Sequence, residues 1–237
     1  MTPSKFIVFE GPDGAGKTTV AKAIAQWMSK ELGRRTAFVQ SPGGTDFANA
    51  LRATVFSGAT KSKQAEAMGL LTAEVDCFES VILPNLLNGN HVIGDRWLMS
   101  GRIYQGFLRG RPTESINKLI DAAITHPRSI PDVHIVLNAQ PEILLERTIN
   151  KIEEAREKAE STDEGKENEE QIALEYEAEL EALNGNIDFY KHAWSAYQKC
   201  TSFAAGSPCI VLDTSEKTPE ECIQRVREII MQGVLSI

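Results

Sequence analysis

The sequence of 237 residues contains no long apolar run and little cysteine or histidine. None of its apolar stretches approaches the roughly 18 consecutive residues of a membrane-spanning helix, so we expect no such helix. The run Phe6–Phe9 is too short for the apolar region of a secretory signal peptide, and it leads directly into a glycine-rich motif. We therefore expect no leader of this kind and a cytoplasmic location.

Metal-binding and disulfide patterns are missing as well. The chain has four cysteines without C-x-x-C spacing or a nearby histidine partner, and its four histidines lie apart. These spacings disfavour a zinc site and a disulfide framework, so we expect reduced, buried thiols, as in a cytoplasmic protein. The cysteines are Cys77, Cys200, Cys209 and Cys222.

An excess of positive charge is also absent, because 25 Lys and Arg against 33 Asp and Glu give a formal net charge of −8. This balance argues against a broad nucleic-acid-binding surface, although a local basic cleft is compatible with it. The 42% of hydrophobic and 24% of charged residues are typical of a globular protein with a full core. The length allows one large domain or one domain with an insertion.

What the sequence does contain is a phosphate-binding motif. Residues 11–18 fit the pattern G-x-x-x-x-G-K-[ST] and lie between a strand-length apolar run and a segment with helical periodicity. The glycines let backbone N–H groups curl around an anion, and the start of the helix adds its positive end. We expect Lys17 to bridge the β- and γ-phosphates of a nucleoside triphosphate and Thr18 to help hold Mg²⁺. The candidate nucleotide-binding residues are Gly11, Asp13, Gly14, Ala15, Gly16, Lys17, Thr18 and Thr19.

Strand-like and helical segments alternate along the chain. This order predicts an α/β fold of three layers, a P-loop NTPase fold with a five-stranded parallel sheet flanked by helices. The expected strands are Lys5–Glu10, Thr36–Gln40, His91–Asp95, Val133–Asn138 and Cys209–Asp213. The expected helices are Thr18–Leu32, Ala48–Phe56, Gln64–Leu87, Thr113–Ala123, Glu142–Arg156 and Pro219–Gln232.

Ligands of such folds bind beyond the carboxyl ends of the strands. The P-loop, the turn Pro42–Thr45 and the pair Asp95-Arg96 each follow an expected strand, so we expect them to meet at one edge of the sheet.

An acidic segment interrupts the alternation. Residues 152–186 carry few apolar side chains and include one further helical piece, Ile172–Leu183, that ends at an Asn-Gly-Asn break. We interpret residues 142–190 as a helical lid region with this acidic insertion, within a single P-loop domain that covers residues 1–237.

The residues after the third strand narrow the class of P-loop protein. The chain has no N-K-x-D motif of the kind with which GTPases recognise guanine, and Asp95 is followed by Arg96 rather than by the Glu typical of motor ATPases. Asp95 can hold Mg²⁺ or orient an acceptor, and Arg96 can bind the phosphate of a second substrate with paired hydrogen bonds. The alternative is that Asp95 caps a helix and Arg96 forms a surface ion pair.

At this point the chain resembles the thymidylate kinase family nearly from end to end. The matching segments are Phe9–Thr19, Pro42–Thr45, Leu51-Arg52, Asp95–Trp97, Ser100, Tyr104–Gly106, Pro141-Glu142, Asp188–Tyr190 and Tyr197. The resemblance implies a phosphotransferase that passes the γ-phosphoryl group of ATP to dTMP with Mg²⁺. It also implies a homodimer, for which the apolar stretch Met68–Leu87 is a candidate interface.

The resemblance also implies roles for single residues. Asp13 would contact the 3′-hydroxyl of the acceptor, Arg52 and Arg96 its phosphate, and Tyr104 its deoxyribose. The middle of the P-loop lacks an arginine, which indicates the lid-arginine type, with Arg147 as the best match. The candidate catalytic residues are Lys17, Asp95, Arg96 and Arg147, with Thr18 and Asp95 at the metal. The candidate acceptor-binding residues are Asp13, Arg52, Leu70, Glu74, Arg96, Ser100, Tyr104 and Gln105.

Two departures from the family pattern leave alternatives open. An ungapped alignment through Asp95 puts Glu74 where the family has its base-reading arginine, Asp76 where it has a glutamine, and Leu70 near its base-stacking aromatic residue. A carboxylate would repel the 4-oxo group of thymine and accept from an amino group such as N4 of cytosine. The acceptor could therefore be dCMP or a 5-modified pyrimidine nucleotide, unless the alignment slips or Arg102 pairs with Glu74.

The second departure is the lid, which offers few arginines. Lys151 and Arg156 are further candidates, and Arg102, Arg109 or Arg111 would have to act if the lid contributes none. A nucleotide-binding module without kinase activity is the remaining alternative.

Overall fold

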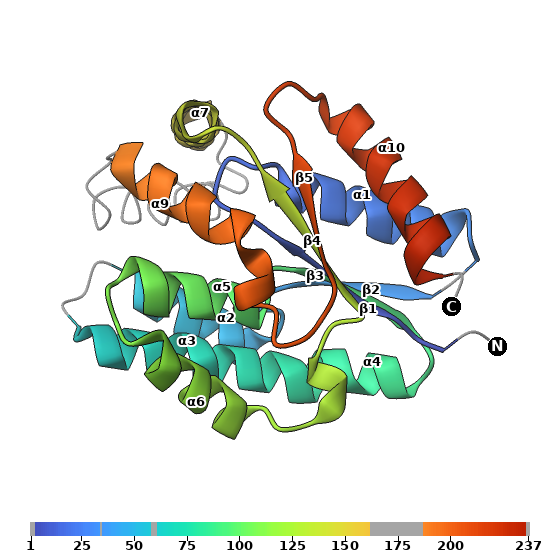
Figure 1. Cartoon of the computed structure of the whole chain (residues 1–237), viewed down its shortest axis with the longest axis horizontal. Coiled ribbons are helices and arrows are strands. Elements are labelled where there is room, and N and C mark those ends of the chain that lie inside the picture. Colours follow the sequence, from blue (N-terminus) through green and yellow to red (C-terminus); the bar gives the residue numbers. More distant parts are fainter. Residues whose placement is uncertain (1–2, 34, 58–60, 162–186, 236–237) are drawn as a thin grey trace.

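The structure of the chain is a computed structural model that describes residues 3–33, 35–57, 61–161 and 187–235. At its centre lies a five-stranded sheet with the strand order β2-β3-β1-β4-β5, in which every pair is parallel (Figure 1). The strands are β1 (Phe6–Glu10), β2 (Thr36–Gln40), β3 (His91–Asp95), β4 (Val133–Asn138) and β5 (Cys209–Asp213). The predicted sheet is confirmed, and only β1 begins one residue later than expected.

The three central strands are buried along their whole length because helices cover both faces of the sheet. Alternate side chains of β1 therefore enter two different parts of the core. Ile7 and Phe9 pack with α1 (Lys17–Lys30) and α10 (Pro219–Ile229), whereas Phe6 and Val8 pack with the helices below the sheet in Figure 1.

Most helices lie where the alternation predicts them. The layer below the sheet in Figure 1 contains α2 (Asp46–Phe56), α3 (Lys63–Cys77), α4 (Leu83–Leu87), α5 (Leu98–Gly101) and α6 (Thr113–Ala123). The other helices of the described residues are α7 (Pro141–Ser161) and α9 (Ile187–Gln198), which contact each other. Helix α9 was not among the expected helices. Short π-helical and 3₁₀ segments are η1 (Phe78–Ile82), η2 (Arg102–Leu108), η3 (Pro127–Ser129), η4 (Cys200–Ser202) and η5 (Ile230–Val234).

Three differences from the expected helices stand out. The expected helix 64–87 is helical throughout but contains the π-helical turn η1 between α3 and α4. The helix α7 continues to Ser161, beyond the expected end at Arg156. The segments α5 and η2 were not predicted, because α5 has only four residues and its short apolar pattern is interrupted by glycine. The end of the acidic insertion, residues 162–186, lies outside the described residues together with the helix expected at 172–183.

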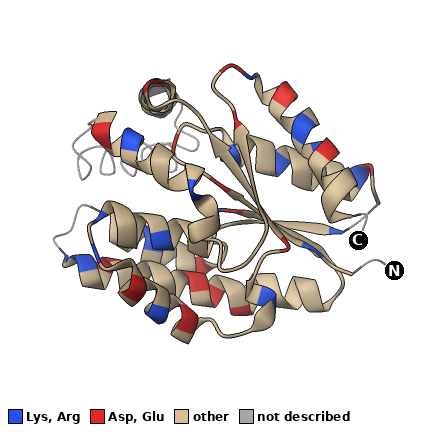
Figure 2. Ribbon diagram, viewed as in Figure 1, with Lys and Arg blue, Asp and Glu red and all other residues tan. Residues whose placement is uncertain are grey.

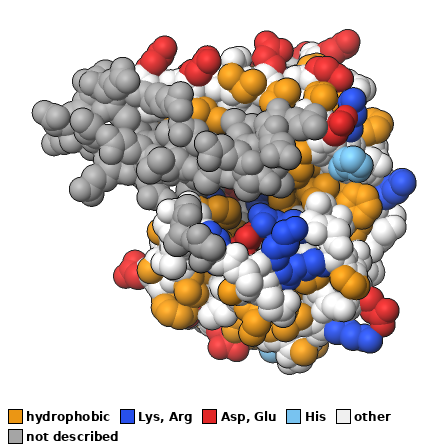
Figure 3. All heavy atoms as spheres, turned by 90° about the vertical axis from the view of Figure 1, so that its left-hand side faces the viewer, with side chains coloured by type: hydrophobic (Ala, Val, Ile, Leu, Met, Phe, Trp, Pro, Cys, Tyr) orange, Lys and Arg blue, Asp and Glu red, His pale blue; other side chains and the backbone are white. Residues whose placement is uncertain are grey.

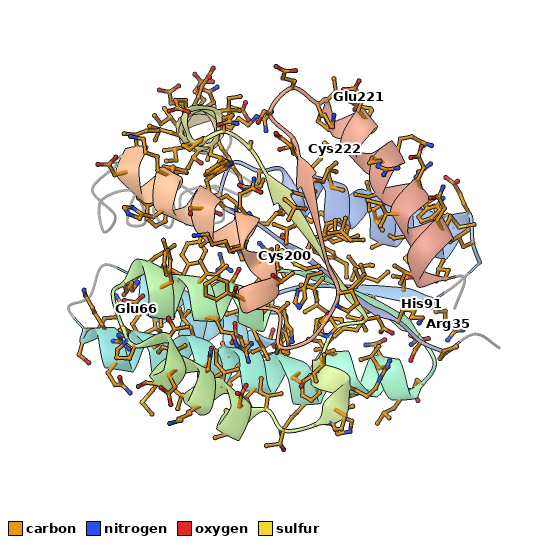
Figure 4. All side chains as sticks on the ribbon, in the orientation of Figure 1. Arg35, Glu66, His91, Cys200, Glu221 and Cys222 are labelled. Atoms are coloured by element: carbon orange, nitrogen blue, oxygen red, sulfur yellow. A yellow bond between two sulfur atoms is a disulfide. The ribbon has the colours of Figure 1, made fainter. Side chains whose placement is uncertain are left out.

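The expectation of four reduced thiols is wrong for one pair. Cys200 and Cys209 are joined by a disulfide, with their Cα atoms 6.6 Å apart, because η4 turns the chain back toward the start of β5. Cys77 and Cys222 are free and buried (Figure 4 labels Cys200 and Cys222). The cysteines therefore do not indicate in which compartment the protein is located.

Within the described ranges, no helix has both the length and the hydropathy required to cross a membrane.

Candidate active site

The ends of three neighbouring strands meet at one edge of the sheet. Asp95 at the end of β3 lies in register with Gln40 of β2 and with Phe9 of β1. The P-loop, the turn after β2 and the pair Asp95-Arg96 therefore converge, as predicted. Acidic and basic residues occur together at these strand ends (Figure 2), and Figure 3 shows lysine and arginine side chains gathered at a recess on this side of the molecule.

The recess belongs to a cavity of about 680 Å³ that contains most of the predicted site. From the P-loop it is lined by Asp13, Gly14, Gly16, Lys17, Thr18 and Thr19. From the other elements the predicted residues at its wall are Arg52, Leu70, Glu74, Asp95, Arg96, Ser100, Tyr104, Gln105 and Arg147. Two predicted residues, Gly11 and Ala15, do not line it.

The P-loop lies so close to neighbouring backbone that two of its positions have no room for a side chain, which explains why they are glycines. A β-carbon at Gly11 would lie 1.9 Å from the carbonyl oxygen of Leu137, and one at Gly14 would lie 2.4 Å from that of Leu144. Both glycines also have positive φ, at 142° and 80°. Helix α1 begins directly after Gly16, which has no side chain to cap the first amides, so these amides remain available to an anion.

Lys17 lies buried beneath this loop. Its Nζ donates to the carbonyl oxygen of Pro12 over 2.7 Å and lies 3.7 Å from Oδ1 of Asp13. Burial and the nearby Arg96 lower the pKa of Lys17 to about 8, against the opposing effect of Asp13 and Asp95. A bound phosphate group would place further negative charge beside this ammonium and so stabilise its charged form.

Thr18 and Asp95 form a pair of oxygen donors at the edge of the cavity. The Thr18 hydroxyl donates to Oδ2 of Asp95 over 2.5 Å. A hydroxyl and a carboxylate are hard oxygen ligands, which suit Mg²⁺. In the described part of the chain no three or more His, Cys, Asp or Glu side chains cluster as for a metal ion, so phosphate oxygens and water would have to complete the shell.

Arg96 is held in the cavity by several partners. Its backbone is left-handed, with φ at 68°, an uncommon conformation for a residue other than glycine. Its guanidinium donates to the carbonyl oxygen of Gly11 over 2.8 Å and to Ser100 Oγ over 3.1 Å, and it forms an ion pair with Asp13. It also lies over the ring of Tyr104, 5.1 Å from the centroid. The alternative of a surface ion pair for Arg96 is therefore wrong.

Glu10 is a structural part of the site that sequence analysis missed. Its Oε1 accepts from the backbone N–H of Trp97 over 2.8 Å and of Ser100 over 3.3 Å, and its Oε2 accepts from Ser100 Oγ over 2.6 Å. Burial raises the pKa of Glu10 to about 7, against the lowering effect of Ser100 and Arg96. An acidic residue at the end of an apolar strand was the signal available in the sequence.

Apart from Asp13 and Arg96, the residues predicted to bind the acceptor come from α2, α3, α5 and η2. The Tyr104 hydroxyl donates to Oδ2 of Asp13 over 3.2 Å, and Nη1 of Arg52 donates to the carbonyl oxygen of Pro42 over 3.2 Å. Leu70 and Glu74 are buried on α3. Asp76 takes no part in the cavity wall, because it accepts a hydrogen bond from Thr45, the N-cap of α2.

Two basic residues of α7, Arg147 and Lys151, have different surroundings. The guanidinium of Arg147 donates to the carbonyl oxygens of Thr214 over 2.9 Å and of Ser215 over 3.4 Å, which ties α7 to the end of β5. Lys151 follows one turn later, is exposed to solvent on one side and also borders the cavity.

Charged residues around the cavity change the pKa of Lys151. Burial lowers the pKa of Lys151, Asp13 and Asp95 raise it, and Arg96 and Arg52 lower it. The ammonium therefore lies within electrostatic range of both carboxylates and both arginines.

Three other candidate cations each have a side-chain partner in the described part of the chain. Arg102 pairs with Asp121 over 2.7 Å, and Arg109 pairs with Glu66 over 2.7 Å. Arg111 donates to Gln64 over 3.4 Å. The side chain of Arg156 lies outside the described residues.

Comparisons with known proteins agree on one family. Residues 9–186 match the family model described as thymidylate kinase. The thymidylate kinase of Caldicellulosiruptor saccharolyticus is 30% identical over 228 residues, which cover 95% of this chain and 95% of that protein. A crystal structure of thymidylate kinase from Ehrlichia chaffeensis superimposes with a TM-score of 0.69 at 20% identity, over 97% of this chain and 99% of the other. The likeness to that structure concerns the fold.

Proposed function

The chain belongs to the thymidylate kinase family of phosphotransferases, and we propose that it transfers the γ-phosphoryl group of ATP to dTMP, giving ADP and dTDP. The observation that best supports this proposal is that the cavity is continuous. One space runs from Lys17 and Thr18 of the P-loop, past Asp13 and Arg96, to the buried residues of α3. A triphosphate at one end and a monophosphate at the other would meet over Arg96.

In this proposal the P-loop binds the phosphates of ATP. The first amides of α1 and the ammonium of Lys17 face the β- and γ-phosphates, and burial of Lys17 strengthens the attraction. Thr18 and Asp95 would hold Mg²⁺, and the bound ion would neutralise part of the phosphate charge. The hydroxyl of Thr18 would turn from Asp95 toward the metal.

The acceptor is held by the residues around Arg96. The guanidinium of Arg96 and that of Arg52 bind its phosphate, Asp13 accepts from its 3′-hydroxyl, and Tyr104 packs beside its deoxyribose. Because Arg96 is fixed by Gly11, Ser100 and Asp13, it would hold the attacking oxygen in one position. Phosphoryl transfer between phosphates then needs positioning and charge stabilisation rather than a general base.

We assign the cation over the transferring group to Lys151 rather than to Arg147. Lys151 interacts with the charges of Asp13 and Asp95, whereas Arg147 is bonded to the carbonyl oxygens of Thr214 and Ser215. Arg147 would act as a positioning residue that fixes α7 over the P-loop. Movement of α7 toward the sheet would exclude water, which otherwise hydrolyses ATP.

We further propose that two copies of the chain associate through α2 and α3 and that the enzyme acts in the cytoplasm, where ATP is available. Phe47 on α2 and Met68 on α3 are exposed by 55% and 50%. Sedimentation of the purified protein tests the association, since a monomer at micromolar concentration would contradict it.

The proposed reaction is tested by ADP release from Mg·ATP with each monophosphate in turn: dTMP, dUMP, dCMP, dGMP and dAMP. We expect turnover that depends on the added monophosphate and is fastest with dTMP. Lys17→Ala serves as the control, because it removes the phosphate-binding cation and should lower turnover by about 10³-fold. Equal ADP release with and without any monophosphate would contradict the proposal.

A further inference from the structure

The part of the cavity beside α3 and α6 is apolar except at a few points. Its apolar wall is made by Ala67, Leu70, Leu71, Ile116, Leu119 and Ile120. Such a space suits a flat base better than it suits a sugar or a phosphate. Two buried carboxyl groups of α3, those of Glu66 and Glu74, interrupt this wall (Figure 4 labels Glu66).

The two carboxyl groups differ in their partners. Glu66 forms an ion pair with Arg109 over 2.7 Å and accepts from Gln105 over 3.4 Å. Glu74 is 5% exposed, and its carboxyl group accepts no hydrogen bond from any residue in the described ranges. Both of its oxygens lie 3.8 Å from the point where a β-carbon on Gly101 would stand, and Gly101 itself lines the cavity. The polar end of Glu74 is therefore at the cavity wall and lacks a partner there.

The groups around Glu74 favour its neutral form. Burial and the charge of Glu10 on β1 raise the pKa of Glu74 to about 8, and Arg102 on η2 opposes them. Arg102 is itself paired with Asp121 on α6, and Arg109 is paired with Glu66. At neutral pH most molecules thus carry a carboxylic acid at this position.

A carboxylic acid offers what a thymine base requires. It has an O–H that donates and a second oxygen that accepts, whereas an ionised carboxylate only accepts. Thymine presents an accepting O4 next to a donating N3–H. A neutral Glu74 can satisfy both, and an ionised Glu74 would face O4 with a second acceptor.

We propose that Glu74 is the residue that recognises the base of the acceptor, donating its carboxyl O–H to O4 of thymine and accepting from N3–H. This inference rests on the proposed function and adds the residue that determines base specificity. An ionised carboxyl group would repel O4 of thymine, whereas the neutral carboxyl group is suited to the base. The same contact makes dTMP binding sensitive to pH through Glu74, in addition to any effect of Glu10 and Lys17.

The test is calorimetric titration of dTMP into the full chain between pH 6.5 and 9. In the wild type we expect Kd to rise about tenfold per pH unit above the pKa of Glu74. Glu74→Gln keeps a donor and an acceptor but cannot ionise, so its Kd should rise much less over this range than the Kd of the wild type. Glu79→Gln removes an exposed carboxyl group of η1 outside the cavity and should follow the wild type.

A second ligand checks the contact with O4 itself. The 4-thio analogue of dTMP carries a weak acceptor at that position, so it should bind the wild type several-fold more weakly than dTMP does. With Glu74→Ala, the two ligands should bind equally. Identical pH profiles for wild type and Glu74→Gln, or an equal loss with the thio analogue in both proteins, would overturn the inference.

The outcome for the reaction is separate. If the chain phosphorylates dTMP but substitution of Glu74 does not change the Kd for dTMP, the proposed function stands and this inference is wrong. Absence of dTMP binding at every pH would remove the inference, and absence of turnover would remove the proposed function.

Discussion

Single residues of the site owe their positions to contacts that are distant in the sequence. Asp95-Arg96 could be predicted from the sequence because the pair follows an apolar strand. The left-handed backbone of Arg96 and its contacts with Gly11 and Asp13 could not, since they depend on how β1 and β3 lie side by side. Lys151 was only a further candidate in the sequence, because a lysine on a charged helix usually faces solvent.

The two basic residues of α7 can be separated by substitution. Lys151→Ala should lower kcat for dTMP by about 10²- to 10³-fold, because it removes charge near the transferring group. Arg147→Ala should lower kcat by less than about tenfold and reduce the free energy of unfolding by about 1–3 kcal/mol, because two carbonyl oxygens lose a donor. Steady-state kinetics and urea unfolding measure both effects. A larger loss of kcat in Arg147→Ala than in Lys151→Ala would reverse the assignment.

Glu74 should also make the stability of the protein depend on pH. Its pKa is about 8 in the folded chain against an ordinary value of 4.5, so folding is penalised once the unfolded chain can release this proton. The free energy of unfolding of the wild type should therefore fall relative to Glu74→Gln from about pH 5 to pH 8, by on the order of 4 kcal/mol at most. Urea unfolding at several pH values measures this difference, and a constant difference would show that burial does not hold the proton on Glu74.

At the scale of elements, strands were predicted more accurately than short helices. All five strands end where the apolar runs predicted. For the three central strands the reason is burial on both faces, which makes each a continuous apolar run. The segment α5 gave no such signal, since it begins after the left-handed Arg96. Its start is fixed by Glu10, which is 87 residues away from Trp97 in the sequence.

The turn before α5 should consequently depend on Glu10. Glu10→Ala leaves the N–H groups of Trp97 and Ser100 without their acceptor in a buried place, which should cost about 2–4 kcal/mol of unfolding free energy. It should also lower the affinity for dTMP, because Arg96 precedes this turn. Glu10→Gln keeps one acceptor and should lose less of both. Urea unfolding and calorimetry compare the two variants, and equal losses would argue against an acceptor role.

At the scale of the whole molecule, the sequence predicted the parallel sheet, its helical layers and the edge at which the motifs meet. These features follow from local patterns and from the handedness of strand–helix–strand units. The disulfide between Cys200 and Cys209 was not predictable, because it depends on how η4 folds back on β5. The raised pKa of Glu74 could not be predicted either, because it depends on burial and on Glu10, which is distant in the sequence.

The measurement that tests the whole account most directly follows a labelled γ-phosphate from ATP. The purified chain is mixed with limiting labelled Mg·ATP and excess dTMP, and the labelled products are separated after a single turnover. The account predicts that the label appears in dTDP and that Lys17→Ala does not form it. Label found only in inorganic phosphate, or left in ATP while dTMP is bound, would contradict the account.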